Sequence, residues 1–137
     1  MQKNDTKITI SELKELVKNF VSARQWENFH TLKNLSMALS VESSELMELL
    51  LWTDSGHKHS LSSDERLKEK RQEIENEIAD IFCYLLSFCN TAHIDLSKAV
   101  IHKMKLNAEK YPVAECLTKA ATDIKDIYKK KQTTKKI

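Results

Sequence analysis

The sequence predicts an all-α protein, a bundle of four to five helices with a four-helix core. Gly56 and Pro112 are the only glycine and the only proline among 137 residues, whereas strands and tight hairpins need such turn residues. Apolar side chains also recur at helical spacing. This length suits one domain with its own core. The glycine-rich phosphate loops of dinucleotide-binding and P-loop proteins are excluded, so phosphate chemistry would depend on side chains and metals.

The first half of the chain predicts two helices. The first spans residues 9–26 and begins with a capping box between Thr9 and Glu12. A break over residues 27–31 leads to the second helix, residues 32–53. The segment 54–64 contains Gly56 and is the one long loop that the sequence predicts.

The second half predicts a long helix followed by shorter ones. Residues 64–92 begin with a charged stretch and end with an apolar one, so one end should be solvated and the other enclosed. A fourth helix runs from the N-cap Asp95 to residue 110 and stops before Pro112. A fifth, weakly amphipathic, spans residues 114–130. We therefore predict a domain over residues 1–113, followed by a C-terminal helix and Lys-rich tail over residues 114–137.

Charge and cysteine content narrow the class of protein. The net charge is +2, and the lysines at the C-terminus are typical of a solvated chain end, so a nucleic-acid partner is not expected. Cys83, Cys89 and Cys116 form no CxxC pair and are predicted to be reduced core residues of a cytoplasmic protein. No apolar run reaches membrane-spanning length and no signal-peptide core is visible, so no membrane partner is expected.

Glu42 occupies an unusual position, in the middle of the apolar stripe of the second helix, with Glu45 one turn along. An unpaired buried carboxylate costs several kcal/mol, and no lysine or arginine shares its helix face. Glu77 and Asp80 form a second i,i+3 pair, which alone is typical of a solvated face. If the two helices pack antiparallel, four carboxylates converge. Such oxygen ligands suit Mg²⁺, with Mn²⁺ as an alternative.

Aromatic side chains gather at the break between the first two helices. Trp26, Phe29 and His30 could form core packing, or the wall of a pocket in which a base stacks. Glu27 and His30 also form one ExxH pair, the ligand motif of di-iron bundles. Those bundles need two such pairs and two further glutamates, which disfavours a di-iron site.

Three runs of sequence resemble the MazG-like nucleotide pyrophosphohydrolases, in particular their small dCTP pyrophosphatase branch. The runs are WENFHTLKNLSMALSVESSELMELLLW, EIENEIADIFCYLL and KMKLNAEKYP, at residues 26–52, 73–86 and 103–112. The resemblance covers about residues 10–113. It implies an all-α enzyme that hydrolyses nucleoside triphosphates, often deoxy or non-standard ones, to the monophosphate and pyrophosphate. It also implies Mg²⁺ and assembly as dimers or dimers of dimers.

The resemblance assigns roles to individual residues. Its metal-binding ExxE and ExxD pairs fall on Glu42, Glu45, Glu77 and Asp80, which are also the expected catalytic residues. Its base-pocket positions fall on Trp26, Phe29, His30, Trp52 and Tyr84. Positions that contact phosphate or sugar fall on Asn34, Lys103, Asn107, Lys110 and Tyr111. The chain departs from the family at Val41, where the broader motif has a glutamate, and at Val17, which aligns with a histidine of eukaryotic dCTP enzymes.

Two functions follow as hypotheses. The first is a cytoplasmic, Mg²⁺-dependent pyrophosphohydrolase that acts on dCTP or non-standard nucleotides as a homodimer or homotetramer and cleanses the nucleotide pool. The second is a non-catalytic helical module that binds nucleotide or a protein partner through the same pocket. The intact set of four acidic residues favours the first, because a non-catalytic protein has no need of a carboxylate in an apolar stripe.

Overall fold

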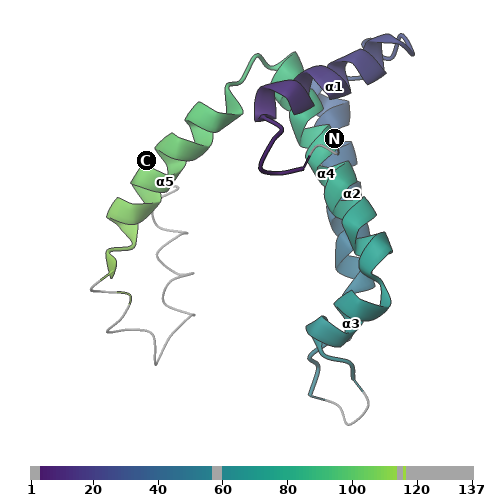
Figure 1. Ribbon diagram of the computed structural model, residues 1–137, viewed down its shortest axis with the longest axis vertical. Coiled ribbons are helices and arrows are strands. Elements are labelled where there is room, and N and C mark those ends of the chain that lie inside the picture. Colours follow the sequence, from purple (N-terminus) through teal and green to yellow (C-terminus); the bar gives the residue numbers. More distant parts are fainter. Residues whose placement is uncertain (1–3, 57–59, 114–115, 117–137) are drawn as a thin grey trace. The chain divides into compact units, whose positions relative to one another are not determined.

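The computed structural model describes residues 4–56, 60–113 and 116. Within them the chain forms helices and no strand, which confirms the predicted all-α class (Figure 1). The helices are α1 (Ile10–Ser22), α2 (Leu32–Leu49), α3 (Ser63–Glu69), α4 (Arg71–Thr91) and α5 (Leu96–Lys110). The helix predicted over residues 114–130 lies outside the described residues.

The chain divides into two compact units, Met1–Leu96 and Ser97–Ile137, and each is described by itself. The first contains α1 to α4, and the second contains nearly all of α5. The predicted division after residue 113 concerns the extent of a family domain and stays a prediction. None of the helices in the described part of the chain combines the length and apolar character needed to cross a membrane.

Helix α1 begins as predicted and ends earlier than predicted. The Thr9 hydroxyl accepts a hydrogen bond from the Glu12 backbone N–H at 3.2 Å, and the Glu12 carboxylate accepts one from the Thr9 N–H at 2.8 Å. The helix stops at Ser22, so the predicted end at residue 26 is wrong. Gln25 adopts a left-handed backbone (φ 54°), a conformation that ends helices and sends Trp26 out of the helix.

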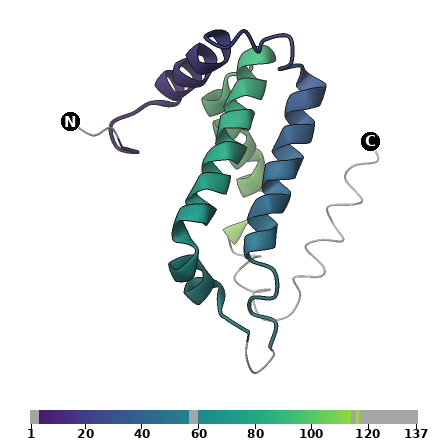
Figure 2. The ribbon, with the colours of Figure 1, turned by 90° about the vertical axis from the view of Figure 1, so that its right-hand side faces the viewer.

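Helices α2 and α4 form the centre of the first unit. They run antiparallel and lie side by side along most of their length (Figure 2), which is the condition under which the acidic residues of the two helices can converge. Leu35 of α2 and Leu86 of α4 are the most deeply buried side chains, 2% and 1% exposed. Burying such a side chain stabilises the fold by about 1.5–3 kcal/mol. This pairing fixes the relative height of every residue on the two helices.

Helix α1 packs against the C-terminal half of α4. The side-chain amide of Asn90 donates to the Lys14 carbonyl at 2.9 Å, and the Lys14 ammonium donates to the Ile94 carbonyl at 2.9 Å. These two bonds join residues about 80 positions apart in sequence. They place the apolar face of α1 beside the apolar half of α4.

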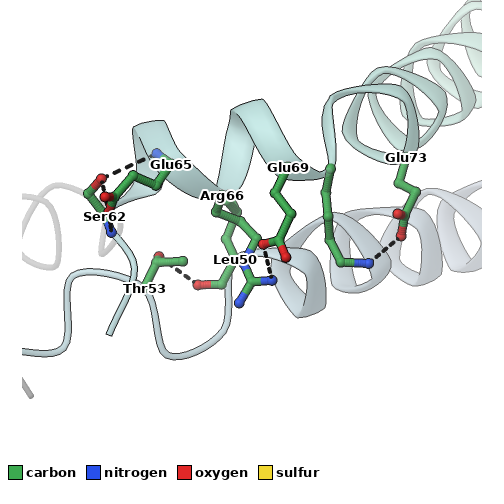
Figure 3. Close-up of polar contacts among 8 residues, drawn as sticks. Leu50, Thr53, Ser62, Glu65, Arg66, Glu69 and Glu73 are labelled. Carbon is green, nitrogen blue, oxygen red and sulfur yellow. Dashed lines mark hydrogen bonds and ion pairs between the residues drawn. The ribbon is translucent and has the colours of Figure 1, made fainter. Parts of the chain in front are cut away.

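The long helix predicted over residues 64–92 is interrupted, so that prediction is wrong in one respect. Lys70 leaves the helical conformation (φ −117°, ψ 30°) and separates α3 from α4. Ser62 and Glu65 cap α3, and the pairs Arg66–Glu69 and Lys70–Glu73 follow at 3.0 and 2.7 Å (Figure 3). Exposed pairs of this kind stabilise a helix by only about 0.3–0.5 kcal/mol. They do not force the charged stretch to continue as one straight helix.

The end of α2 also differs from the prediction. The helix ends at Leu49 rather than at residue 53, because Leu50 already leaves helical geometry (φ −104°, ψ 2°). Trp52 and Asp54, which follow, adopt left-handed backbone conformations (φ 64° and 50°). The Thr53 hydroxyl donates to the Leu50 carbonyl at 2.8 Å (Figure 3), and the Asp54 carboxylate accepts from the Ser63 N–H at 3.2 Å. Of the predicted loop over residues 54–64, the described residues 54–56 and 60–62 lie outside the helices, whereas Ser63 and Asp64 begin α3.

The three cysteines are free thiols, as predicted, but only one belongs to the core. Cys89 is buried, whereas Cys83 and Cys116 are exposed. Cys83 is exposed because its part of α4 faces a cavity described below. The prediction that all three are core residues is therefore wrong for these two.

Candidate functional site

Three carboxylates from two helices converge at the centre of the first unit. Glu42 and Glu45 of α2 and Glu77 of α4 each place a carboxylate oxygen within 4.8 Å of the others. Spacing of i,i+3 puts the two α2 residues on adjacent turns of one face, and the antiparallel pairing of α2 with α4 brings Glu77 opposite them. Asp80 lies one turn further along α4, outside this group of three. We call these four residues the acidic cluster.

Burial and mutual repulsion make the acidic cluster costly in the absence of a cation. Burial, and then the charges of Glu45, Asp80 and Glu77, raise the pKa of Glu42 above 4.5. Burial, and then Glu45 and Asp80, raise the pKa of Glu77 in the same way. Glu42 and Glu77 are half-buried, while Glu45 and Asp80 are exposed. The expectation of a buried Glu42 is thus met only in part.

The acidic cluster fits a divalent cation. One oxygen of Glu77, Oε2, is buried and makes no hydrogen bond. None of the ion pairs between described residues includes a member of the cluster. Oxygen-only ligands on two helices suit a hard cation such as Mg²⁺, Mn²⁺ or Ca²⁺ and not a zinc ion. Glu42, Glu45, Glu77 and Asp80 are the residues that would hold it.

The raised pKa of Glu42 leads to a prediction for the metal-free chain. Because the folded state binds this proton more tightly than the unfolded state does, Glu42 costs stability as the pH rises through the interval above 4.5. Glu42→Gln keeps the volume and removes the charge. In EDTA, the melting temperature of the variant should exceed that of wild type at neutral pH, and the two should converge in acid. A lower melting temperature of the variant at neutral pH would mean that a positively charged side chain of the protein stabilises the Glu42 carboxylate.

A cavity of about 490 Å³ adjoins the acidic cluster. Asp80 belongs to both, so the cavity opens at the end of the cluster. Its walls come from α1, from the turn after it and from α4. The lining residues are Leu16, Val17, Phe20, Val21, Trp26, His30, Asp80, Cys83, Tyr84 and Ser87.

Three of the five predicted base-pocket residues line this cavity. The rings of Trp26 and His30 are stacked, with centroids 6.5 Å apart and an angle of 28°. Burial, and then the charges of Glu42 and Asp80, raise the pKa of Tyr84, so its hydroxyl stays protonated and can donate a hydrogen bond. The cavity therefore offers flat aromatic surfaces beside a cluster of carboxylates.

The other two predicted base-pocket residues lie elsewhere in this unit. Phe29 and Trp52 are 69% and 80% exposed, and neither lines the cavity. Trp52 follows the C-terminal end of α2, whereas Trp26 and His30 precede its start. The 18 residues of α2 span about 27 Å. One chain therefore cannot bring Trp52 to the same base as Trp26.

The five residues predicted to contact phosphate or sugar divide into two groups. The Asn34 amide donates to the Phe29 carbonyl at 3.0 Å, so it supports the turn before α2. The others lie in the second unit, where Lys103, Asn107 and Lys110 follow one another at helical spacing on α5. The Tyr111 N–H donates to the Asn107 carbonyl at 2.9 Å. Their phosphate-binding role stays a prediction.

Most of the cavity wall was not predicted from the sequence. No site was assigned to the apolar residues of α1, of which Leu16 and Phe20 remain 63% and 50% exposed. Cys83 was predicted as a core residue, and Ser87 was assigned no role. The position of Ser87 carries a usable signal, because Asp80, Tyr84 and Ser87 follow at i, i+4 and i+7 on α4 and therefore share a face.

The fold and the site together define a class of protein: an all-α domain in which antiparallel helices present an ExxE and an ExxD pair beside an aromatic pocket. The chain belongs to the MazG-like family, whose model matches residues 37–124. That match includes the whole acidic cluster.

The chain is also similar in sequence and in structure to individual pyrophosphatases. The chain is 33% identical to dCTP pyrophosphatase 1 of Rattus norvegicus over 105 residues, which cover 77% of this chain and 60% of the relative. It is 33% identical to dCTP pyrophosphatase 1 of Homo sapiens over 104 residues, which cover 76% and 59%. A crystal structure of a pyrophosphatase from Archaeoglobus fulgidus matches with a TM-score of 0.68 and 37% identity, covering 81% of this chain and 99% of that one. The chain thus spans about 60% of the length of the curated relatives it matches.

Proposed function

We propose that this chain is a metal-dependent nucleoside triphosphate pyrophosphohydrolase, which cleaves a (d)NTP to the (d)NMP and pyrophosphate. The proposed substrates are deoxynucleotides such as dCTP, or non-standard nucleotides. The observation that carries the proposal is that the acidic cluster and the aromatic cavity share Asp80. A base stacked in the cavity would extend its phosphates toward the carboxylates. The names of the relatives, which are pyrophosphatases, support the same reaction.

The side chains divide the proposed work. Trp26, His30 and Tyr84 would hold the base by stacking. The carboxylates of the acidic cluster would hold Mg²⁺, with Mn²⁺ as an alternative. When bound, such an ion stabilises charge on the phosphate oxygens and lowers the pKa of a coordinated water. For the phosphates, we propose the α5 residues that the resemblance implies: Lys103 and Lys110 would offset negative charge, and the Asn107 amide would donate a hydrogen bond.

A second copy of the chain is the proposed partner, in a homodimer or homotetramer. Apolar side chains remain exposed along the central helices: Met37, Val41 and Met47 on α2 and Ile78 on α4. Exposed apolar side chains gathered on neighbouring helices favour an interface. Light scattering coupled to size-exclusion chromatography measures the mass of the assembly directly.

The free thiols favour a reducing compartment, and we propose the cytoplasm.

A pyrophosphate-release assay on the common dNTPs and NTPs tests the proposed reaction. We expect stoichiometric monophosphate and pyrophosphate with Mg²⁺ and none with EDTA. Release of inorganic phosphate, or of nothing from any substrate, would overturn the proposal. Nucleotide binding without turnover would instead support the non-catalytic module.

Metal binding should also be visible without substrate. Mg²⁺ that binds only the folded chain adds about 2.7 kcal/mol to the free energy of unfolding at a hundredfold excess over Kd, so the melting temperature rises with the Mg²⁺ concentration. We expect this rise in melting temperature in wild type. In Glu77→Gln we expect a smaller rise, because the substitution removes the negative charge of the carboxylate that contains the buried oxygen Oε2. An equal rise in both proteins would place the metal elsewhere.

A further inference from the structure

Ser87 of α4 differs from every other polar residue in the described part of the chain, because it alone is buried, with 6% of its surface exposed. A hydroxyl that leaves water without a partner destabilises a fold, so buried hydroxyls normally make a hydrogen bond. Among the described residues, the Ser87 side chain makes none. It is therefore a buried polar group that the fold itself does not use.

The serines of α2 show how a serine in a helix usually finds a partner. The hydroxyls of Ser40, Ser43 and Ser44 each donate to the carbonyl four residues earlier, at 3.0, 2.7 and 2.9 Å. Such bonds satisfy the hydroxyl within its own helix. These three side chains are exposed, whereas the Ser87 side chain lines a cavity and makes no such bond. Its hydroxyl is thus available to whatever occupies the cavity.

Ser87 lies where two cavities of the first unit meet. It lines the larger cavity of about 490 Å³ and also a smaller one of about 280 Å³. It follows Asp80 by seven positions on the same face of α4, which corresponds to about 10 Å along the helix axis. Asp80 marks the end of the larger cavity that adjoins the acidic cluster. Ser87 is therefore two turns away from the proposed metal and phosphate region, on the part of the wall beyond Tyr84.

The chemistry of the larger cavity gives a single hydroxyl a large share in orienting a ligand. Most of the residues that line this cavity are apolar or aromatic, and in such a pocket the few polar groups determine how a flat ligand lies. A hydroxyl both donates and accepts, and it rotates to suit its partner. It can therefore bond either an amino group or a keto group on the edge of a base.

We propose that Ser87 is a substrate-binding residue whose hydroxyl makes a hydrogen bond to the edge of the bound base, without selecting between amino and keto groups. The inference rests on the proposed function, because it takes a nucleotide base to be the occupant of the larger cavity. The base then supplies the hydrogen-bond partner that the fold leaves out. A ligand without a base leaves the hydroxyl unpaired.

Ser87→Ala tests this hydrogen bond with a small change of volume. For the best substrate in the pyrophosphate-release assay, KM should rise about 2- to 12-fold, the range that follows from one neutral hydrogen bond. The effect on kcat should be smaller, because the base edge is bound equally in the ground state and the transition state. Without ligand, the melting temperature should stay the same or rise, because alanine removes an unpaired hydroxyl and favours the helix.

Two controls separate the base contact from other causes. Deoxyribose 5′-triphosphate carries the phosphates and no base, so its inhibition constant should be the same in wild type and in Ser87→Ala. Ser40→Ala removes a hydroxyl that is bonded within α2 and that lines neither cavity. Its KM should equal that of wild type.

Three results would overturn the inference. They are an unchanged KM in Ser87→Ala, a loss confined to kcat, and weaker inhibition of this variant by deoxyribose 5′-triphosphate. A raised KM together with a lowered melting temperature would also overturn it, because the hydroxyl would then serve the fold. Absence of hydrolysis of every nucleotide by wild type would instead overturn the proposed function, and the inference with it.

Discussion

Replacing Glu45 by alanine is expected to lower kcat at least ~10²-fold, the loss that follows removal of one group that stabilises charge in a transition state. Glu45 lies within 4.8 Å of both Glu42 and Glu77, yet its own side chain is exposed. Truncating it therefore removes a metal ligand without opening a hole in the core. The fold should survive, because the variant also relieves repulsion within the acidic cluster.

The matched control is Glu48→Ala, one turn further along α2 and also exposed. Steady-state pyrophosphate release and far-ultraviolet circular dichroism on the two variants separate chemistry from folding. We expect wild-type kcat in Glu48→Ala and helical spectra in both. Near-full activity of Glu45→Ala would show that the acidic cluster is not the metal site.

The second large effect is expected at the aromatic cavity. Trp26→Ala should raise KM by about 5- to 150-fold, since one stacked base contributes about 1–3 kcal/mol per aromatic contact and 1.4 kcal/mol is a factor of ten. Its effect on kcat should be smaller, because stacking is equal in the ground state and the transition state. Trp26 is only partly exposed at 43% and already contacts His30, so the base would extend an existing stack.

Trp26 also contacts the fold, so the variant needs a conservative counterpart. Its ring meets that of Phe20 edge to face, with centroids 5.9 Å apart. Trp26→Phe keeps a flat ring and should restore most of the affinity. If Trp26→Ala instead lowered the melting temperature strongly and left KM unchanged, Trp26 would be a packing residue and the cavity would bind no base.

The local rules of helix formation could be read from the sequence. The scarcity of glycine and proline predicted an all-α chain, and the Thr9–Glu12 capping box marked the start of α1 correctly. Spacing of i,i+3 predicted that each carboxylate pair shares a face. These features depend on neighbours three or four residues apart, and such neighbours are fixed by the helix itself.

Helix ends were predicted less well. Gln25, Trp52 and Lys70 leave helical geometry in places where the residue type alone does not require it. Left-handed conformations at glutamine and tryptophan cost energy that contacts elsewhere must offset. The residue types around these three positions do not show where packing against another helix stops.

Only the tertiary structure decided which distant residues meet. The height at which α2 lies against α4 brings Glu77 to Glu42 and Glu45, and no local pattern specifies that register. The same packing makes the apolar face of α1 the wall of an open cavity rather than core. Burial of Leu35 and Leu86 determines these distances, because close packing of large side chains permits few alternative registers.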